Sequence, residues 1–286
     1  MPIQNIPEIF IANPLLLPDL FVYDFRMTDE VVKSKVDLSL HMFSFLQTGQ
    51  KKVHFADAAV AVNEHQSLLI KKGNCLMTEL LNKNTVYFCK LLFFSQKKIE
   101  DFLQKHTDSF SLPNIRIEKD VPFFVIENDQ YIKSFIQSLC CIQQMKDGIA
   151  ENLLVVKFEE IMLYLLHKYQ EIFVQYLGSL VSSANYSSFR KTVDLYTYSN
   201  LRLEEIAFLC NMSLSTFKRH FINEYQVPPG KWLLQKRLIK AKEILRKGLR
   251  KPSDIYADSG YNNFSNFCTA FKNEFGYSPH QVINKH

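Results

Sequence analysis

Residues 213–229 read SLSTFKRHFINEYQVPP, and residues 263–279 read NFSNFCTAFKNEFGYSP. The two stretches share a pattern at a spacing of fifty residues. The matching positions are Phe217 with Phe267, Phe221 with Phe271, Tyr225 with Phe275, Pro229 with Pro279, Ser215 with Ser265, and Asn223-Glu224 with Asn273-Glu274. A register kept over this many positions predicts that one supersecondary unit occurs twice.

The residues before the first stretch predict a helix, a tight turn and a second helix. Leu203–Leu209 has helical spacing, with small Ala207 where a partner helix can approach closely. Asn211 suits the turn because Asn tolerates the left-handed conformation, and Ser213 is a preferred N-cap residue for the next helix. This order is that of a helix-turn-helix unit, whose second helix enters the DNA major groove.

The second copy follows the same order. Pro252-Ser253 predicts a helix start, Gly260 predicts the turn, and Asn262 or Asn263 predicts the cap of the following helix. The two helix-turn-helix units are therefore expected over about 203–224 and about 252–275. A joining helix is expected over about 229–247, nineteen residues or about 28 Å. Successive major-groove faces lie ~34 Å apart, so one monomer should cover about 20 base pairs.

Each second helix divides into two faces when its residues are plotted at 100° per residue. The predicted core faces are Leu214, Phe217 and Phe221 in the first helix, and Phe267, Phe271 and Phe275 in the second. The predicted outward faces are Ser215, Lys218, Arg219 and Ile222, and Ser265, Cys268, Thr269 and Lys272. An ordinary solvated face is the alternative, but two repeated units favour DNA contact.

Charge is distributed unevenly along the chain. Residues 1–185 carry 18 Lys and Arg against 21 Asp and Glu, a net charge of −3, whereas residues 186–286 carry 16 against 8, a net charge of +8. A basic C-terminal third indicates a polyanion partner for that part, and nucleic acid is the default candidate. Residues 182–188, SSANYSS, are small, polar and aperiodic, which predicts a linker at 183–187.

The composition excludes several classes of protein. Hydrophobic residues make up 47% and charged residues 22%, as in a globular protein, and no apolar run approaches the ~18–20 residues of a membrane helix. No basic residue precedes Arg26, so no secretory signal is expected. Six cysteines without CxxC pairs indicate reduced thiols in a cytoplasmic protein.

The N-terminal two-thirds predicts strands followed by helices. Residues 36–42 alternate between apolar and polar, and Thr48-Gly49-Gln50 breaks the run. Further short strands are expected at 52–55, 59–62, 67–70, 86–94 and 121–126, with turns at Gly73-Asn74 and Asn82–Asn84. This spacing predicts a small antiparallel barrel or sandwich over 1–127. Helical spacing over 128–182, broken at Asp147-Gly148, predicts two amphipathic helices.

No metal or cofactor is expected. A metal-binding barrel enzyme of the cupin type would need a close His-x-His pair and a carboxylate. His41, His54 and His65 are eleven or more residues apart. Neither a phosphate-binding loop nor a paired catalytic motif is present in the sequence, so catalysis is not expected.

Residues 188–286 resemble the DNA-binding domain of AraC/XylS-family bacterial transcription regulators. The resemblance rests on Leu203–Ala207, Ser213–Phe221, Trp232, Arg237-Leu238, Ala241-Lys242, Gly260-Tyr261, Phe271-Lys272 and Ser278-Pro279, in the family's order. It implies that Ser215, Lys218 and Arg219, together with Ser265, Asn266, Cys268 and Thr269, contact bases. Lys272 joins this set from its place on the outward face.

Three features depart from the family pattern. Asn211 replaces the usual glycine of the first turn, and Tyr256 stands where a small residue is usual. Tyr256 would separate the two helices of the second unit unless Ala257 turned inward. The second outward face also carries little charge, so the first should contribute more base discrimination. Arg237 could serve packing between units or a phosphate contact.

The resemblance gives an α+β architecture: a small cupin-like β-barrel, helices, and an all-α DNA-binding domain. It implies control by a small-molecule effector or a regulatory protein, contact with RNA polymerase, and a homodimer through 150–180. Lys157–Ile161 resembles a segment of relatives controlled by protein partners. The function expected is that of a sequence-specific activator, not an enzyme. Alternatives are a nonspecific architectural DNA-binding protein and a barrel enzyme with a DNA-binding tail.

Overall fold

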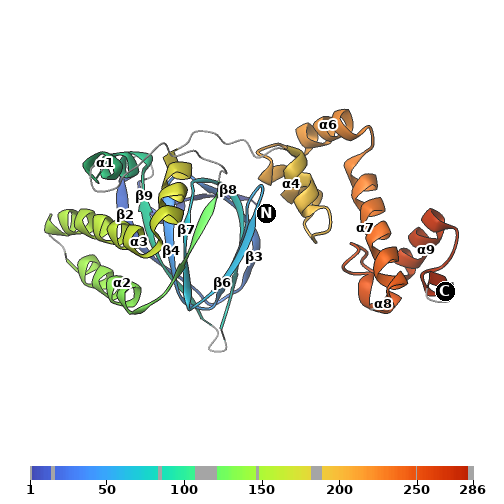
Figure 1. Ribbon diagram of the computed structural model, residues 1–286, viewed down its shortest axis with the longest axis horizontal. Helices are drawn as coiled ribbons and strands as arrows, with labels where there is room; N and C mark the ends of the chain where they lie inside the picture. Colours follow the sequence, from blue (N-terminus) through green and yellow to red (C-terminus); the bar gives the residue numbers. More distant parts are fainter. Residues whose placement is uncertain are drawn as a thin grey trace. The chain divides into compact units, whose positions relative to one another are not determined.

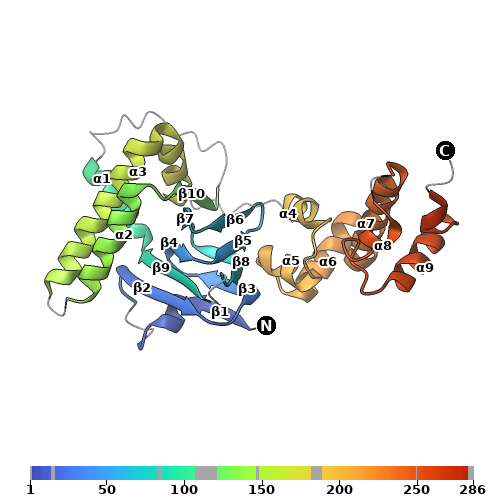
Figure 2. The same cartoon turned by 90° about the horizontal axis from the view of Figure 1, so that it is seen from below.

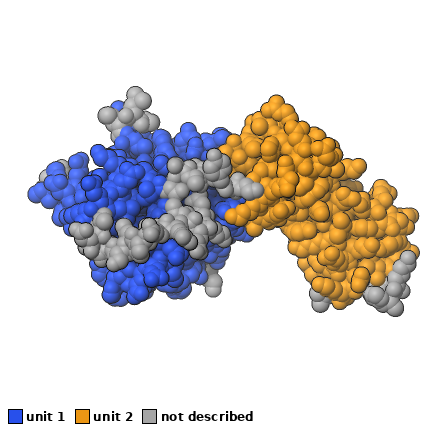
Figure 3. All heavy atoms as spheres, turned by 45° about the horizontal axis from the view of Figure 1, so that its top comes forward, with its two compact units in different colours: residues 1–186 blue, residues 187–286 orange. Residues whose placement is uncertain are grey.

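The computed structural model describes residues 2–13, 17–82, 86–106, 121–145, 148–181, 189–248 and 250–282. The chain divides into two compact units, Met1–Tyr186 and Ser187–His286, shown in blue and orange in Figure 3. The linker predicted at 183–187 lies outside the described residues.

The N-terminal unit contains two five-stranded sheets (Figures 1 and 2). The first has the order β1 (Ile3–Ile6), β3 (Val31–Leu38), β8 (Gly73–Leu80), β5 (Gln50–His54) and β6 (Ala59–Asn63). The second has the order β10 (Phe123–Glu127), β7 (Gln66–Ile70), β4 (His41–Thr48), β9 (Tyr87–Phe94) and β2 (Leu20–Met27). The β1–β3 pair is parallel, and the other described pairs are antiparallel.

The two sheets pack face to face over an apolar layer. The first sheet contributes Val36, Val53 and Met77 to this layer, and the second contributes Leu46 and Phe93. The pairing of the described strands leaves two separate sheets, so closure into a cupin-like barrel is not confirmed. The α+β class itself is present, with a β-rich N-terminal unit and a helical C-terminal unit.

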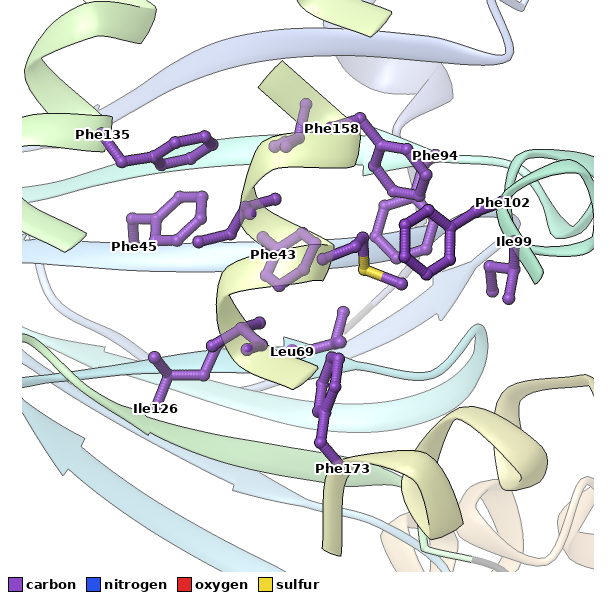
Figure 4. Packing of buried hydrophobic residues seen from close by; sticks show 14 of the residues in the cluster. Phe43, Phe45, Leu69, Phe94, Ile99, Phe102, Ile126, Phe135, Phe158 and Phe173 are labelled. Atoms are coloured by element: carbon purple, nitrogen blue, oxygen red, sulfur yellow. The ribbon is translucent and has the colours of Figure 1, made fainter. Parts of the chain in front are cut away.

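The second sheet is the central layer, because three helices cover its other face. They are α1 (Gln96–His106), α2 (Gln130–Gln143) and α3 (Ile149–Val181). Figure 4 shows Phe43 and Phe45 of β4 beside Phe135 of α2 and Phe158 of α3. Strand β9 is buried on both faces, which explains why its sequence, YFCKLLFF, is almost entirely apolar. Leu91 and Phe93 belong to the layer between the two sheets, and Leu92 and Phe94 face the helices.

Five of the predicted strands are confirmed to within about two residues at each end, namely β5, β6, β7, β9 and β10. The single strand predicted over 36–42 is wrong, because Ser39 and Leu40 form the turn between β3 and β4. The chain passes here from one sheet to the other, and the apolar alternation continues through the turn, so the sequence pattern conceals the break. The turn at Gly73-Asn74 is also wrong, since β8 begins there, and β1, β2 and β8 were not predicted.

The helices after the sheets follow the predicted spacing. Asp129 caps α2 by accepting a hydrogen bond from the Ile132 N–H at 3.0 Å. The predicted break at Asp147-Gly148 falls partly outside the described residues, and α3 begins at Ile149. Gln170 interrupts α3 with a φ of 47°, a kink that the sequence pattern does not predict. None of the helices among the described residues combines the length and the apolar character needed to cross a membrane.

Two lysines are buried with charged partners. Lys51 Nζ donates to Glu79 Oε1 at 2.9 Å, and both side chains lie between the sheets. Burial alone would lower the pKa of Lys51, but the Glu79 carboxylate raises it above its usual value. Lys90, on the helix-facing side of β9, pairs with Asp24 of β2 and donates to Gln143 of α2. These pairs depend on cross-strand register, which places Lys51 opposite Glu79 and Asp24 opposite Lys90.

The C-terminal unit is helical throughout its described residues. Its elements are α4 (Phe189–Tyr196), α5 (Leu203–Leu209), α6 (Leu214–Tyr225), α7 (Pro229–Arg246), α8 (Pro252–Ile255), α9 (Phe264–Phe275) and the short 3-10 helix η4 (Pro279–Val282). Within this unit α7 joins α6 at one end to α8 and α9 at the other (Figure 1).

Candidate nucleic-acid interface

The first helix-turn-helix unit consists of α5 and α6. Ala207 of α5 is completely buried, as expected for a small residue at a close helix approach. Asn211 adopts the left-handed conformation with a φ of 57°, and the Met212 N–H donates to the Ala207 carbonyl at 3.0 Å to close the turn. The predicted turn is therefore confirmed at the predicted residue.

The second helix of this unit, α6, is capped and anchored as predicted. The Ser213 hydroxyl accepts a hydrogen bond from the Thr216 N–H at 3.2 Å. Phe217 and Phe221 are fully buried, and the Phe221 ring lies 5.6 Å from Trp232 of α7. These contacts fix the rotation of α6 about its axis and therefore decide which residues face outward.

The outward face of α6 carries the predicted candidates. Ser215, Lys218 and Arg219 are all exposed, and their spacing of three and four residues places them on one side of the helix. The Ser215 hydroxyl lies 2.9 Å from the Ser213 hydroxyl, so it is held at the helix N-terminus. Ile222, also predicted to face outward, is 43% exposed.

Leu214 was predicted to belong to the core, and this is wrong: its side chain is 37% exposed. Side chains on a helix point back toward its N-terminus, so one in the first residue extends past the end of the helix, where fewer neighbours can cover it. Leu214 is therefore an apolar candidate for base contact that the 100° plot missed. In the sequence, the position of Leu214 directly after the predicted cap Ser213 could have indicated that its side chain is exposed.

The second helix-turn-helix unit repeats this geometry with one difference. Gly260 takes the left-handed conformation with a φ of 84°, and Asn263 caps α9 by accepting from the Asn266 N–H at 2.8 Å. The left-handed residue and the cap are two positions apart in the first turn and three apart in the second. The first helix, α8, is also shorter, with four residues against seven in α5.

Tyr256 occupies the place that Ala207 has in the first unit. The Tyr261 N–H donates to the Tyr256 carbonyl at 3.2 Å, as Met212 does to Ala207. The Tyr256 ring is half-buried and lies 6.0 Å from Phe264, edge to face. Ala257 is exposed, so of the two alternatives considered it does not turn inward to replace the tyrosine. The tyrosine packs instead on the first residue of α9.

The outward face of α9 carries most of the predicted candidates. Ser265, Asn266, Thr269 and Lys272 are exposed. Cys268, also predicted to face outward, is partly exposed and packs on the core of this unit. Burial raises the pKa of its thiol accordingly. Phe267 and Phe271 are fully buried as predicted, whereas Phe275 is partly buried.

Arg237 of α7 contacts the segment after α4 and the turn of the second helix-turn-helix unit. Its Nε donates to the carbonyl of Thr197, just after α4, at 2.9 Å. Its guanidinium also lies against Gly260, where an added methyl group would stand 2.6 Å from Nη1. These contacts show Arg237 in a packing role within the C-terminal unit, while the phosphate contact stays a prediction.

These helices bear the side-chain chemistry that reads base edges. Arg and Lys donate to the O6 and N7 atoms of guanine, and Asn pairs with adenine in a bidentate manner. Ser and Thr hydroxyls donate or accept, and an apolar side chain contacts the thymine methyl group. Within the described residues, no three His, Cys, Asp or Glu side chains are placed to hold a metal ion.

Two family models match the chain. Residues 41–176 match the ExsA N-terminal regulatory domain, and residues 206–285 match a helix-turn-helix domain. Together the two matches span most of the N-terminal sheets and helices and both helix-turn-helix units.

Individual relatives resemble parts of the chain. VirF, a virulence regulon transcriptional activator of Yersinia enterocolitica, is 26% identical over 162 residues, covering 56% of this chain and 59% of VirF. RhaS of Klebsiella pneumoniae, also a transcriptional activator, is 32% identical over 79 residues, covering 28% of each chain. Each of these two matches therefore covers less than two thirds of the relative's own length. The crystal structure of apo ToxT from Vibrio cholerae aligns with 94% of this chain and 98% of its own at 15% identity and a TM-score of 0.44.

Proposed function

Because the chain belongs to the AraC/XylS family of transcription regulators, we propose that it is a sequence-specific DNA-binding transcription activator controlled by its N-terminal unit. The observation that carries this proposal is the pair of capped helices, α6 and α9. Each has a buried phenylalanine face and, opposite it, an exposed polar face. The relatives VirF and RhaS are both named as transcriptional activators, which supports activation over repression.

In this proposal, the N-terminal compact unit has the regulatory role and the C-terminal compact unit binds DNA. Residues 1–127 and 128–182 form the regulatory part, 183–187 the linker, and 188–286 the DNA-binding part. Ser215, Lys218 and Arg219 on α6, and Ser265, Asn266, Thr269 and Lys272 on α9, contact DNA in this proposal. Cys268 is kept in this set with a smaller contribution, because its side chain is partly exposed and packs against the core of the C-terminal unit. Because α6 carries more cationic side chains on its outward face than α9, the first helix-turn-helix unit contributes more of the base discrimination in this proposal.

We further propose that α3 mediates dimerisation. Its exposed apolar residues include Ile149, Val156 and Leu163, which recur every seven residues and are 59%, 59% and 36% exposed. A seven-residue apolar repeat is the pattern by which two helices pack along one another. The control signal is a protein partner or a small effector acting on this regulatory part. Contact with RNA polymerase is part of the same proposal, by family.

The length of α7 sets the size of the expected DNA site. Its eighteen residues span about 27 Å at ~1.5 Å per residue. Adjacent major-groove faces lie ~34 Å apart, so two recognition helices at either end of α7 can enter successive grooves. One monomer should therefore protect an asymmetric site of about 20 base pairs, and a dimer should protect two copies.

The test is a footprint of the full chain on sites recovered by crosslinking across the genome of its source. Protection of about two helical turns that survives excess scrambled competitor DNA at physiological salt is expected. Equal affinity for scrambled DNA would establish a nonspecific architectural protein instead. Protection of a single half-turn would show that α9 does not engage, and Tyr256 would then be the first position to substitute.

A further inference from the structure

The helices α6 and α9 differ in the side chains that are exposed near their N-termini. In α6 the hydroxyls of Ser215 and Thr216 both lie 2.9 Å from the Ser213 hydroxyl, so these polar groups are bonded to one another. Base reading by α6 therefore falls mainly to Lys218 and Arg219, the exposed cations about one turn further along.

No cation stands near the N-terminus of α9. Residues 261–271 contain neither Lys nor Arg, and Lys272 follows only in the third turn of the helix. The residues of a recognition helix that contact base edges are those near its N-terminus. Ser265 and Thr269 are exposed there, but a hydroxyl can either donate or accept and therefore discriminates little among bases. The base preference of α9 must come from another kind of side chain.

Three asparagines, Asn262, Asn263 and Asn266, lie in this stretch. The Asn263 side chain is occupied by the helix cap, since it accepts a hydrogen bond from the Asn266 N–H at 2.8 Å. Asn262 precedes the helix, whereas Asn266 is exposed in its first turn, and its carboxamide makes no hydrogen bond to another described residue. The cap holds the backbone of Asn266, so its side chain presents a donor beside an acceptor from a fixed point.

We propose that α9 recognises adenine, with the Asn266 carboxamide accepting from N6 and donating to N7 in the major groove. A carboxamide matches these two atoms, whereas guanine presents two acceptors, O6 and N7, which suit the cations of α6. The inference rests on the proposed function, because it requires that both helices enter DNA. The chain therefore binds an asymmetric site, with guanine in the part that α6 contacts and adenine in the part that α9 contacts.

The test replaces single adenines of the footprinted site by 7-deazaadenine, in which a C–H group stands in place of the N7 acceptor. The affinity of the full chain is measured for each substituted duplex, so the protein itself is unchanged. One adenine should respond, and Asn266→Ala should weaken binding of the unmodified site by roughly 5- to 150-fold, the range of one bidentate contact. Because both changes remove the same contact, 7-deazaadenine at that position should have little further effect in Asn266→Ala.

Further variants separate base reading from folding. Asn266→Asp keeps the size of the side chain but lacks the donor for N7, so it should also lose the discrimination between adenine and 7-deazaadenine. Asn223→Ala is the matched control, because Asn223 is an exposed asparagine of α6, and it should keep the wild-type response. Trp232 is the single tryptophan of the sequence and lies in the C-terminal unit, so its fluorescence during urea denaturation shows whether each variant is folded.

The inference is overturned if no adenine of the site responds to 7-deazaadenine, or if the responding adenine responds equally in the wild type and in a folded Asn266→Ala variant. In either case the wild-type chain would still prefer its site over scrambled DNA, and the proposed function would stand. A wild-type chain that binds both DNAs equally would overturn the proposed function and this inference together.

Discussion

Gly260 leaves room for the guanidinium of Arg237: a methyl group on Gly260 would stand 2.6 Å from Nη1. The same arginine holds the Thr197 carbonyl at 2.9 Å through Nε. One side chain on the joining helix thus contacts the segment before the first helix-turn-helix unit and the turn of the second. This contact makes the conformation of the second turn depend on α7.

We expect Gly260→Ala to destabilise the C-terminal unit by about 2–3 kcal/mol, from a left-handed alanine and from displacement of Arg237. Gly276→Ala is the matched control, because Gly276 has nearly the same φ, 81° against 84°, and open space where the methyl would go. The Gly276→Ala substitution should lower the free energy of unfolding by only about 1 kcal/mol, the cost of a left-handed alanine alone. Urea denaturation followed by Trp232 fluorescence measures both. Equal costs would mean that Arg237 moves away freely.

Arg219→Ala should weaken specific DNA binding by about 1–3 kcal/mol and relax the preference at one base pair, because a bidentate contact to guanine would be lost. Arg246→Ala, an exposed arginine in the last turn of α7, is the control for lost charge alone. Affinity for the specific and a scrambled site is measured for each. Unchanged specific affinity in a folded Arg219→Ala variant would remove Arg219 from the interface.

Glu79→Gln should destabilise the N-terminal unit by about 3–5 kcal/mol, because it leaves the Lys51 charge buried without its partner at 2.9 Å. The double variant Lys51→Met, Glu79→Met removes both charges and should cost far less. Denaturation curves of the wild type and the two variants give the comparison. A double variant as unstable as Glu79→Gln would show that volume, not charge, governs this position.

The N-terminal unit should lose stability as the pH falls from about 6.5 toward 4. His41 is fully buried, and burial lowers its pKa from 6.5 to about 4. The unfolded chain therefore takes up the proton first, so the stability present above pH 6.5 is lost on acidification, by up to about 3 kcal/mol from this group.

The neutral ring is held by two hydrogen bonds: the Lys72 N–H donates to Nδ1 at 3.3 Å, and Nε2 donates to Gln96 Oε1 at 3.0 Å. Gln has an amide that can serve both partners without titrating. His41→Gln should therefore reduce the pH dependence of the unfolding free energy, leaving the part due to His54, whose pKa is also lowered to about 4. His65→Gln, at an exposed position, should not reduce it. Parallel curves for wild type and His41→Gln would exclude His41 as the source.

The sequence by itself determined the C-terminal unit in detail. Asn211 and Gly260 at the turns, Ser213 and Asn263 at the caps, and the paired phenylalanines of α6 and α9 all lie where local chemistry predicts them. Caps, left-handed turns and helical faces depend on neighbours within four residues. A single sequence therefore contains nearly all the information that specifies them.

The tertiary structure alone decided what depends on distant residues. The turn at Ser39 and Leu40, where the chain passes from β3 in one sheet to β4 in the other, lies inside an unbroken apolar alternation. The Lys51–Glu79 pair depends on the register between strands whose paired residues are 28 apart in the sequence. Whether Cys268 is covered, and what Arg237 contacts, likewise depends on how helices pack. Strand pairing and helix packing bring together residues that are far apart in the sequence. No local sequence pattern identifies which distant residues will be in contact.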